Sequence, residues 1–297
     1  MIDGLTILCL PVNHCLFWNW LSDKTNVKTV TNKDGEILER YASYKGLDFA
    51  YFVKGQHYTT EPQRTQVKGS IHVYFNDGKG NETDFNYSSL VKALTEFAME
   101  TKIDLSKTIL NSLEIGVNIG LPFCPDDFFL HLIHYRNKPF EYRILGDEIS
   151  KICCYTQFRI KFYDKGLQKG LPTNLMRFEI AFSRMEILNK IGIRTLADII
   201  NPEKYQKLGE LLLKYYDGIL IGNSIIDRSD LKHKKQISFE QGHRAEFWRT
   251  FEKSNKGRCK RSRAKKIFKT ILANTGAYQL KAEMKERICQ KIDELKA

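Results

Sequence analysis

The chain has 297 residues, of which 42% are hydrophobic and 12% aromatic, enough to bury a sizeable core and to exclude a disordered chain. Lysine and arginine total 47 against 35 acidic residues, so the formal charge of +12 favours a polyanion, above all nucleic acid, as partner. The seven cysteines are scattered and never spaced as Cys-x-x-Cys, which argues against a disulfide framework or a zinc ribbon and predicts a cytoplasmic location.

The most apolar stretch near the N-terminus, Ile7 to Trp20, is interrupted by Pro11, Asn13 and His14. It also lacks a basic leader, so it fits neither a signal peptide nor a membrane span. We therefore expect no membrane partner.

Residues 2 to 86 alternate short β-branched and aromatic runs with turn residues, which predicts antiparallel hairpins. The strongest strand pattern is Gly69 to Phe75. Thr83 to Tyr87 is its expected return partner across the turn Asn76-Asp77-Gly78-Lys79-Gly80. Ser88 to Thr101 then carries an apolar stripe at helical spacing, introduced by serines that can cap a helix.

Three further strands are predicted at Leu113 to Ile119, Thr156 to Tyr163 and Leu175 to Phe182, with a helix at Pro125 to Tyr135. Beyond about Ser183 the patterns are helical. The expected helices are Ile187 to Ile200, Glu203 to Tyr216, Phe239 to Lys253, Ala264 to Leu272 and Tyr278 to Leu295. The sequence thus predicts an α+β protein, with an antiparallel sheet in residues 1–183 and a mainly helical, basic region in residues 184–297.

Two of these strands present acids on the face opposite their apolar side chains. Leu113, Ile115 and Val117 alternate with Glu114 and Asn118, because successive side chains of a strand point to opposite faces. By the same rule, Arg177 and Glu179 lie opposite Phe178, Ile180 and Phe182. Both polar faces could also be ordinary solvated surfaces.

The strand between them places Phe158, Ile160 and Phe162 on its buried side. Its other side carries Gln157, Arg159, Lys161, Tyr163 and Lys165. A tyrosine among cations is suited to attack a phosphodiester, because the cations hold phosphate oxygens and stabilise negative charge. A tyrosine on a strand that only binds DNA is the alternative.

From Val67 to Gly222 the sequence resembles the replication initiation factors of rolling-circle plasmids and filamentous phages. The resemblance rests on three ordered blocks, Leu113-Glu114-Ile115-Gly116-Val117-Asn118, Ile160-Lys161-Phe162-Tyr163-Asp164-Lys165-Gly166 and Leu175-Met176-Arg177-Phe178-Glu179-Ile180. In that family a sheet-based site uses a tyrosine to cleave one strand at the origin, with a divalent metal held by acidic side chains. The products are a 5′-phosphotyrosyl link and a free 3′-hydroxyl.

Carried onto this chain, the resemblance implies Tyr163 as nucleophile, with Tyr155 as the next choice. Glu114 and Glu179 would hold Mg²⁺ or Mn²⁺, and Lys165 or Arg177 would contact the scissile phosphate. Arg159 and Lys161 would bind DNA. The implied partners are single- and double-stranded origin DNA, and the family also suggests a homodimer and a host helicase or polymerase.

Related relaxase-type initiators hold their metal with a His-hydrophobic-His pair, whereas this chain has His131-Leu132-Ile133-His134. On the predicted helix, His131 and His134 would share a face at i,i+3 spacing and could reach a metal. An amphipathic helix with incidental histidines is the favoured interpretation.

A basic segment from Lys256 to Lys269 contains no acid, and a smaller patch lies at Lys232 to Lys235. Because a solvated helix face normally mixes signs, the longer segment predicts a phosphate-binding surface. Its cations are Lys256, Arg258, Lys260, Arg261, Arg263, Lys265, Lys266 and Lys269. Two other functions remain open, a DNA-binding regulator without enzymatic activity and a metal-dependent nuclease that uses water.

Overall fold

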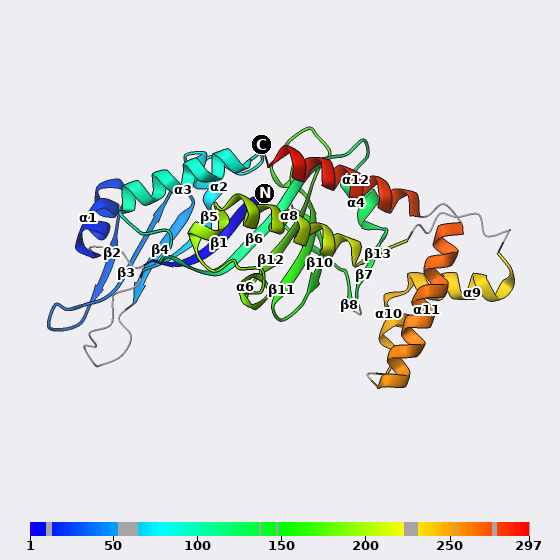
Figure 1. Cartoon of the computed structure of the whole chain (residues 1–297). Coiled ribbons are helices and arrows are strands. Elements are labelled where there is room, and N and C mark those ends of the chain that lie inside the picture. Colours follow the sequence, from blue (N-terminus) through cyan, green and yellow to red (C-terminus); the bar gives the residue numbers. More distant parts are fainter. Residues whose placement is uncertain are drawn as a thin grey trace.

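The computed structural model describes residues 1–9, 14–52, 65–136, 138–146, 148–222, 231–252, 254–274 and 278–296. Its centre is a ten-stranded antiparallel sheet of order β2-β3-β4-β5-β1-β6-β12-β11-β10-β9 (Figure 1). The strands are β1 Ile2–Cys9, β2 Lys28–Thr31, β3 Ile37–Tyr44, β4 Leu47–Phe52, β5 Thr65–Ser70, β6 Ile109–Gly120, β9 Glu141–Leu145, β10 Glu148–Cys154, β11 Phe158–Asp164 and β12 Leu175–Phe182. The predicted α+β class with an antiparallel sheet is confirmed.

Helices cover one face of this sheet. Figure 1 shows α3 (Tyr87–Thr101), α8 (Pro202–Asp217) and α12 (Tyr278–Glu294) running along the same side of it. The apolar sides of β6, β11 and β12 join the same buried cluster as the apolar stripes of these helices. The opposite face of the central strands therefore carries their polar side chains.

Shorter helices complete the main body. They are α1 His14–Lys24, α2 Ile71–Phe75, α4 Pro125–Phe129, α5 Lys165–Gln168, α6 Glu186–Asn189 and α7 Leu196–Ile199. The predicted helix from 187 to 200 is thus divided into α6 and α7. The predicted strand from 156 to 163 is β11, and the helix from 88 to 101 is α3, capped by Asn86, whose side chain accepts a hydrogen bond from the Ser89 amide at 2.9 Å.

The predicted strand Gly69 to Phe75 is wrong, because β5 ends at Ser70 and α2 follows directly. The Ser70 side chain caps this helix by accepting a hydrogen bond from the amide of Val73 at 3.1 Å. The expected return strand at Thr83 to Tyr87 is also wrong, since Tyr87 begins α3. The predicted turn after Phe75 is present, but the Ser70 cap makes the segment before it a helix and not a strand.

The predicted helix Pro125 to Tyr135 is only half right, because α4 ends at Phe129 and the chain continues as β7. Strand β7 (Leu132–Tyr135) is buried throughout and lies in a second, three-stranded sheet of order β13-β7-β8, with β13 Ile219–Ile221 and β8 Lys138–Pro139. Pairing with β13, which is distant in the sequence, overrides the helical pattern of this segment.

Helices α9 (His233–His243), α10 (Ala245–Arg249) and α11 (Asn255–Asn274) form a lobe at the end of the molecule opposite α1 (Figure 1). The predicted helix from 239 to 253 corresponds to parts of α9 and α10, and Lys253 lies outside the described residues. The lobe has its own apolar cluster, Phe239, Trp248, Phe268, Ile271 and Leu272, which also packs on Ile133 and Leu220 of the second sheet. The division of the chain near residue 183 stays a prediction.

No helix in the described part of the chain is long and apolar enough to cross a membrane. Pro11 and Asn13, which interrupt the N-terminal apolar stretch, lie outside the described residues.

Candidate active site

Strand register gathers the predicted site residues on the polar face of the sheet. Tyr163 of β11 pairs with Arg177 of β12, and Lys161 pairs with Glu179. Glu114 of β6 pairs with Ala181, two residues beyond Glu179 on β12. Since paired residues and their i+2 neighbours share a face, all of these side chains lie on one side of the sheet.

This face is hollowed into a polar pocket of about 600 Å³. Its wall includes Tyr163, Lys165, Glu114 and Glu179, together with Asp3 and Gly4 of β1. The remaining cations at the pocket are Lys68, Arg159, Lys161 and Lys169. Four of the five proposed catalytic and metal-binding side chains therefore line one space, and the fifth, Arg177, lies behind it.

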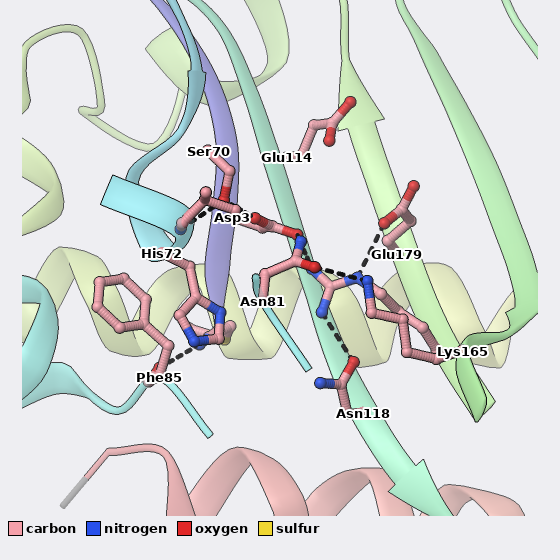
Figure 2. A network of polar contacts seen from close by, with 12 residues as sticks. Asp3, Ser70, His72, Asn81, Phe85, Glu114, Asn118, Lys165 and Glu179 are labelled. Carbon is pink, nitrogen blue, oxygen red and sulfur yellow. Dashed lines mark hydrogen bonds and ion pairs between the residues drawn. The ribbon is translucent and has the colours of Figure 1, made fainter. Parts of the chain in front are cut away.

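Arg177 is only 4% exposed and is held by its neighbours on every nitrogen. Its Nε donates to Glu179 Oε2 at 2.9 Å, its Nη1 donates to Asn118 Oδ1 at 2.9 Å, and its Nη2 lies 3.1 Å from Asp3 Oδ2 (Figure 2). The guanidinium thus fixes two carboxylates from different strands, in the planar geometry that suits arginine.

Asp3 was not identified from the sequence as part of the site. It is 5% exposed, and it accepts hydrogen bonds from the Ser70 hydroxyl and, at 2.6 Å, from Asn81 Nδ2. Burial alone would raise the pKa of Asp3, but Arg177 and the Ser70 hydroxyl outweigh it and lower that pKa. The signal in the sequence was a single acid inside the apolar strand Ile2–Cys9.

Tyr163 is 4% exposed, and its hydroxyl donates to Glu179 Oε2 at 3.5 Å. Burial, and then the negative charge of Glu179, raise the pKa of Tyr163 well above its usual value. The ammonium of Lys161 lies 4.1 Å from the centre of the Tyr163 ring, and that of Lys165 lies 5.6 Å from it. In this state the phenol keeps its proton, so a phenolate needs further positive charge or a proton acceptor.

Glu114 and Glu179 point to the same side of the sheet from neighbouring strands (Figure 2). Burial, and then the like charge of Glu179, raise the pKa of Glu114. Arg159 pairs with Glu114 Oε1 at 2.9 Å and offsets part of this repulsion. Gly4 leaves room for the carboxylate, because a Cβ at that position would lie 2.5 Å from Glu114 Oε2.

Two nearby carboxylates match the way magnesium is commonly bound, through one or two protein carboxylates plus substrate phosphates. Among the described residues there is no group of three or more His, Cys, Asp or Glu side chains that could hold a metal ion. An ion at Glu114 and Glu179 would therefore need further oxygen ligands from water or a bound phosphate.

The alternative site residues lie elsewhere. Tyr155 does not line the pocket, and its hydroxyl donates to the carbonyl of Tyr135 at 2.8 Å. The expected shared helical face of His131 and His134 is wrong because α4 ends before both residues. His131 Nδ1 lies 3.1 Å from the Gly222 carbonyl, and His134 is buried against Trp248 with ring centres 5.0 Å apart.

The basic segment forms most of α11, away from the pocket (Figure 1). Lys256, Arg258, Lys260, Arg263 and Lys266 are exposed. Arg261 and Lys265 are half-buried, and Arg261 Nη2 donates to the Phe251 carbonyl at 3.2 Å. Burial lowers the pKa of Lys265. The exposed members can reach a polyanion, whereas Arg261 also stabilises the lobe.

Among solved structures, the chain is similar to the rolling circle replication initiator protein from Geobacillus stearothermophilus. The two share 12% identity, the match covers 80% of this chain and 89% of that one, and the TM-score is 0.41. A second similarity, to the di-domain ARO/CYC StfQ of the steffimycin biosynthetic pathway, has 11% identity, covers 72% and 94% of the two chains, and reaches a TM-score of 0.19. No protein-family model and no curated protein matches the sequence.

Proposed function

We propose that this protein binds a replication origin and nicks one DNA strand through Tyr163 to start rolling-circle replication. The observation that carries the proposal is the contact of the Tyr163 hydroxyl with Glu179, in a pocket that also contains Glu114 and several cations. A nucleophile, a proton acceptor and groups that bind phosphate are the parts that transfer of a phosphodiester to a side chain requires.

The chemistry assigned to these residues is a transesterification. The Tyr163 oxygen attacks phosphorus and its proton passes to Glu179, whose Oε2 already accepts the hydroxyl. The bond from phosphorus to the 3′-oxygen breaks, which leaves the 5′-phosphate on the tyrosine, and the released 3′-oxygen takes up a proton to become a 3′-hydroxyl. Lys165, at the pocket wall, is the residue assigned to the scissile phosphate, because Arg177 is fully engaged by Asp3, Asn118 and Glu179.

Glu114 and Glu179 are the residues that would hold Mg²⁺ or Mn²⁺, and their mutual repulsion is the feature that a cation would relieve. When bound there, a divalent ion would polarise a phosphoryl oxygen and offset negative charge next to Tyr163. Arg159, at the outer side of Glu114, and Lys161 would then contact the DNA backbone.

Duplex binding is assigned to the exposed cations of α11, because they are concentrated on an element remote from the pocket. The pocket itself would take a single strand, since Tyr163 can reach a phosphate only when the strand enters the hollow of the sheet. Double- and single-stranded origin DNA are therefore proposed partners of different parts of the chain.

The proposal is tested by trapping a covalent protein–DNA adduct with supercoiled origin DNA and with a single-stranded origin oligonucleotide. Tyr163→Phe should abolish the adduct and the nick while leaving DNA affinity within a few-fold, because only the attacking oxygen is lost. Tyr155→Phe is the matched control and should keep both, and peptide mass spectrometry should place the link on Tyr163.

Three outcomes would contradict the proposal. Cleavage without an adduct, still dependent on Glu114 and Glu179, would identify a nuclease that uses water. Binding without any cleavage would identify a regulator without enzymatic activity. An adduct that persists in Tyr163→Phe would move the nucleophile to another tyrosine.

A further inference from the structure

Lys165 differs from three other cations of the pocket, Arg159, Lys161 and Lys169, in what holds its charged group. Arg159 pairs with Glu114, Lys161 with Glu148 at 2.7 Å, and Lys169 with Glu82 at 3.9 Å. Lys165 Nζ instead donates to two neutral amide oxygens, Asn81 Oδ1 at 2.7 Å and Gln168 Oε1 at 3.1 Å. Among the described residues, no carboxylate accepts a hydrogen bond from this ammonium, so its charge is solvated by the two amides without being neutralised.

Each of these amides is held in one orientation by an acid. Asn81 Nδ2 donates to Asp3 Oδ2 at 2.6 Å, and Gln168 Nε2 donates to Glu148 Oε2 at 2.6 Å. Because the NH₂ side of each amide is fixed by a carboxylate, its oxygen must face Lys165. Figure 2 shows Asp3, Asn81 and Lys165 in this sequence across the site. The ammonium is therefore held in a defined place at the pocket wall.

The local backbone also fixes Lys165. It directly follows β11, where the Asp164 side chain caps α5 by accepting a hydrogen bond from the Leu167 amide at 2.7 Å. Gly166 permits this tight turn, since a Cβ there would lie 2.1 Å from the Thr173 carbonyl oxygen. Lys165 itself is 2% exposed, so its position two residues after Tyr163 is set by packing as well as by hydrogen bonds.

From this arrangement, and resting on the proposed function, we infer that Lys165 is the general acid that protonates the leaving 3′-oxygen. As the Tyr163 oxygen bonds to phosphorus, its proton goes to Glu179, and the bond from phosphorus to the 3′-oxygen breaks. A proton from the Lys165 ammonium passes to that oxygen, giving a 3′-hydroxyl and a neutral amine. The reverse transfer would assist rejoining of the strand.

The pKa of the Lys165 ammonium suits the role of a general acid. Burial, and then the nearby charge of Arg177, lower the pKa of Lys165 to about 8, although Asp3 and Glu179 act in the opposite direction. Lys169, which directly follows α5, is a further positive neighbour that lowers this pKa. A proton donor works best when its pKa lies near the working pH, and an ordinary lysine, at 10.5, would release its proton far less readily.

The test replaces the leaving oxygen by sulfur, in a single-stranded origin oligonucleotide with a 3′-phosphorothiolate at the scissile position. A thiolate leaves without a proton, so it needs no general acid. Lys165→Met should slow nicking of the ordinary oligonucleotide by roughly 100-fold or more, yet cleave the sulfur substrate within a few-fold of the unmodified protein. Lys165→Arg, which keeps the charge but does not release a proton at neutral pH, should behave in the same way.

Lys68→Met is the matched control, because it removes another cation of the pocket wall and should affect both substrates equally. With the unmodified protein, nicking of the ordinary substrate should decline as the pH rises through about 8 relative to nicking of the sulfur substrate. Equal slowing of Lys165→Met on both substrates would overturn the inference and leave Lys165 as a phosphate contact. Absence of a Tyr163 adduct with either substrate in the unmodified protein would overturn the proposed function itself.

Discussion

The two cationic regions of this protein are built in opposite ways. At the pocket, Arg177 and Lys165 are 4% and 2% exposed. Arg177 is held by side chains of β1, β6 and β12, and Lys165 by the side-chain amides of Asn81 and Gln168. On α11, Lys256, Lys260 and Arg263 are exposed to solvent. Burial makes a charge expensive unless it is paired and hydrogen-bonded, whereas an exposed charge keeps its water and is screened by salt.

This difference in burial distinguishes two tasks, positioning a reacting group and binding the DNA backbone. The net charge of the chain does not distinguish them. Interlocked charges can hold a reacting group within a narrow range of positions, which chemistry requires. Exposed charges can exchange counterions for phosphates without reference to base sequence. We therefore expect pocket substitutions to change stability or rate, and α11 substitutions to change affinity and its salt dependence.

The largest expected effect is on stability, from Arg177→Met. This change leaves Asp3 and Glu179 buried without their cation, and breaking a buried pair in this way costs about 3–5 kcal/mol. The matched control is Arg159→Met, whose pair with Glu114 is half exposed on the arginine side and should contribute about 1 kcal/mol or less. Chemical denaturation of the three proteins measures both values.

A fall in pH should weaken the ion pair between Asp3 and Arg177 in the unmodified protein. Because the folded pKa of Asp3 lies below 3.8, its contribution to stability is present above that pH and is lost as the pH falls through the folded value. If Arg177→Met lowered the free energy of unfolding no more than Arg159→Met does, the contrast between buried and exposed cations would be wrong.

The next effect is on rate. Glu114→Gln or Glu179→Gln should slow nicking by roughly 100-fold, about 3 kcal/mol of transition-state stabilisation, if each carboxylate helps to hold a divalent ion. Both changes should also weaken Mn²⁺ binding, measured by electron paramagnetic resonance without DNA. Glu82→Gln, which removes the partner of Lys169, is the control. Unchanged Mn²⁺ affinity in both variants would place the ion elsewhere.

The smallest effect concerns α11. Lys256, Lys260 and Arg263 lie at i, i+4 and i+7, so they share a helix face. Changing all three to alanine should weaken binding to specific and non-specific duplexes alike, and should reduce the slope of log K against log salt by roughly 0.9 per lost contact. Nicking of a short single strand should stay unchanged.

Alanine at Lys24, Lys28 and Lys33 removes the same charge from the opposite end of the molecule and serves as the control. If both triple variants reduced the slope of log K against log salt equally, net charge and not the α11 surface would govern DNA binding.

The sequence was sufficient where one strand face is apolar. In β6, β11 and β12 the alternation alone placed Glu114, Tyr163 and Glu179 on a common face, because the register of a half-buried strand is strongly determined. It failed at Ile71–Phe75, where β-branched and aromatic residues fit a strand or a helix equally well and the Ser70 cap decides. Local composition cannot reveal such a competition.

The polar supports of the site were less accessible to sequence reasoning. Asp3 is a single acid in an apolar strand, and Asn81 follows a glycine-rich turn, so neither belongs to a recognisable spacing. They meet Arg177 and Lys165 only through the order of strands in the sheet. Arg177, expected either to contact phosphate or to face solvent, instead lies behind the pocket because Asp3 of β1 and Glu179 of β12 hold it there.

This assembly has a consequence for the chain during folding. The hairpin of β11 and β12 carries Tyr163, Lys165 and Glu179, but Asn81 is 84 positions away from Lys165, and Glu114 belongs to a different strand pair. Contacts so distant in sequence form late, after the entropy of closing long loops has been overcome. An incompletely folded chain, although already cationic and able to adhere to DNA, would therefore hold the tyrosine without the groups that make it cut.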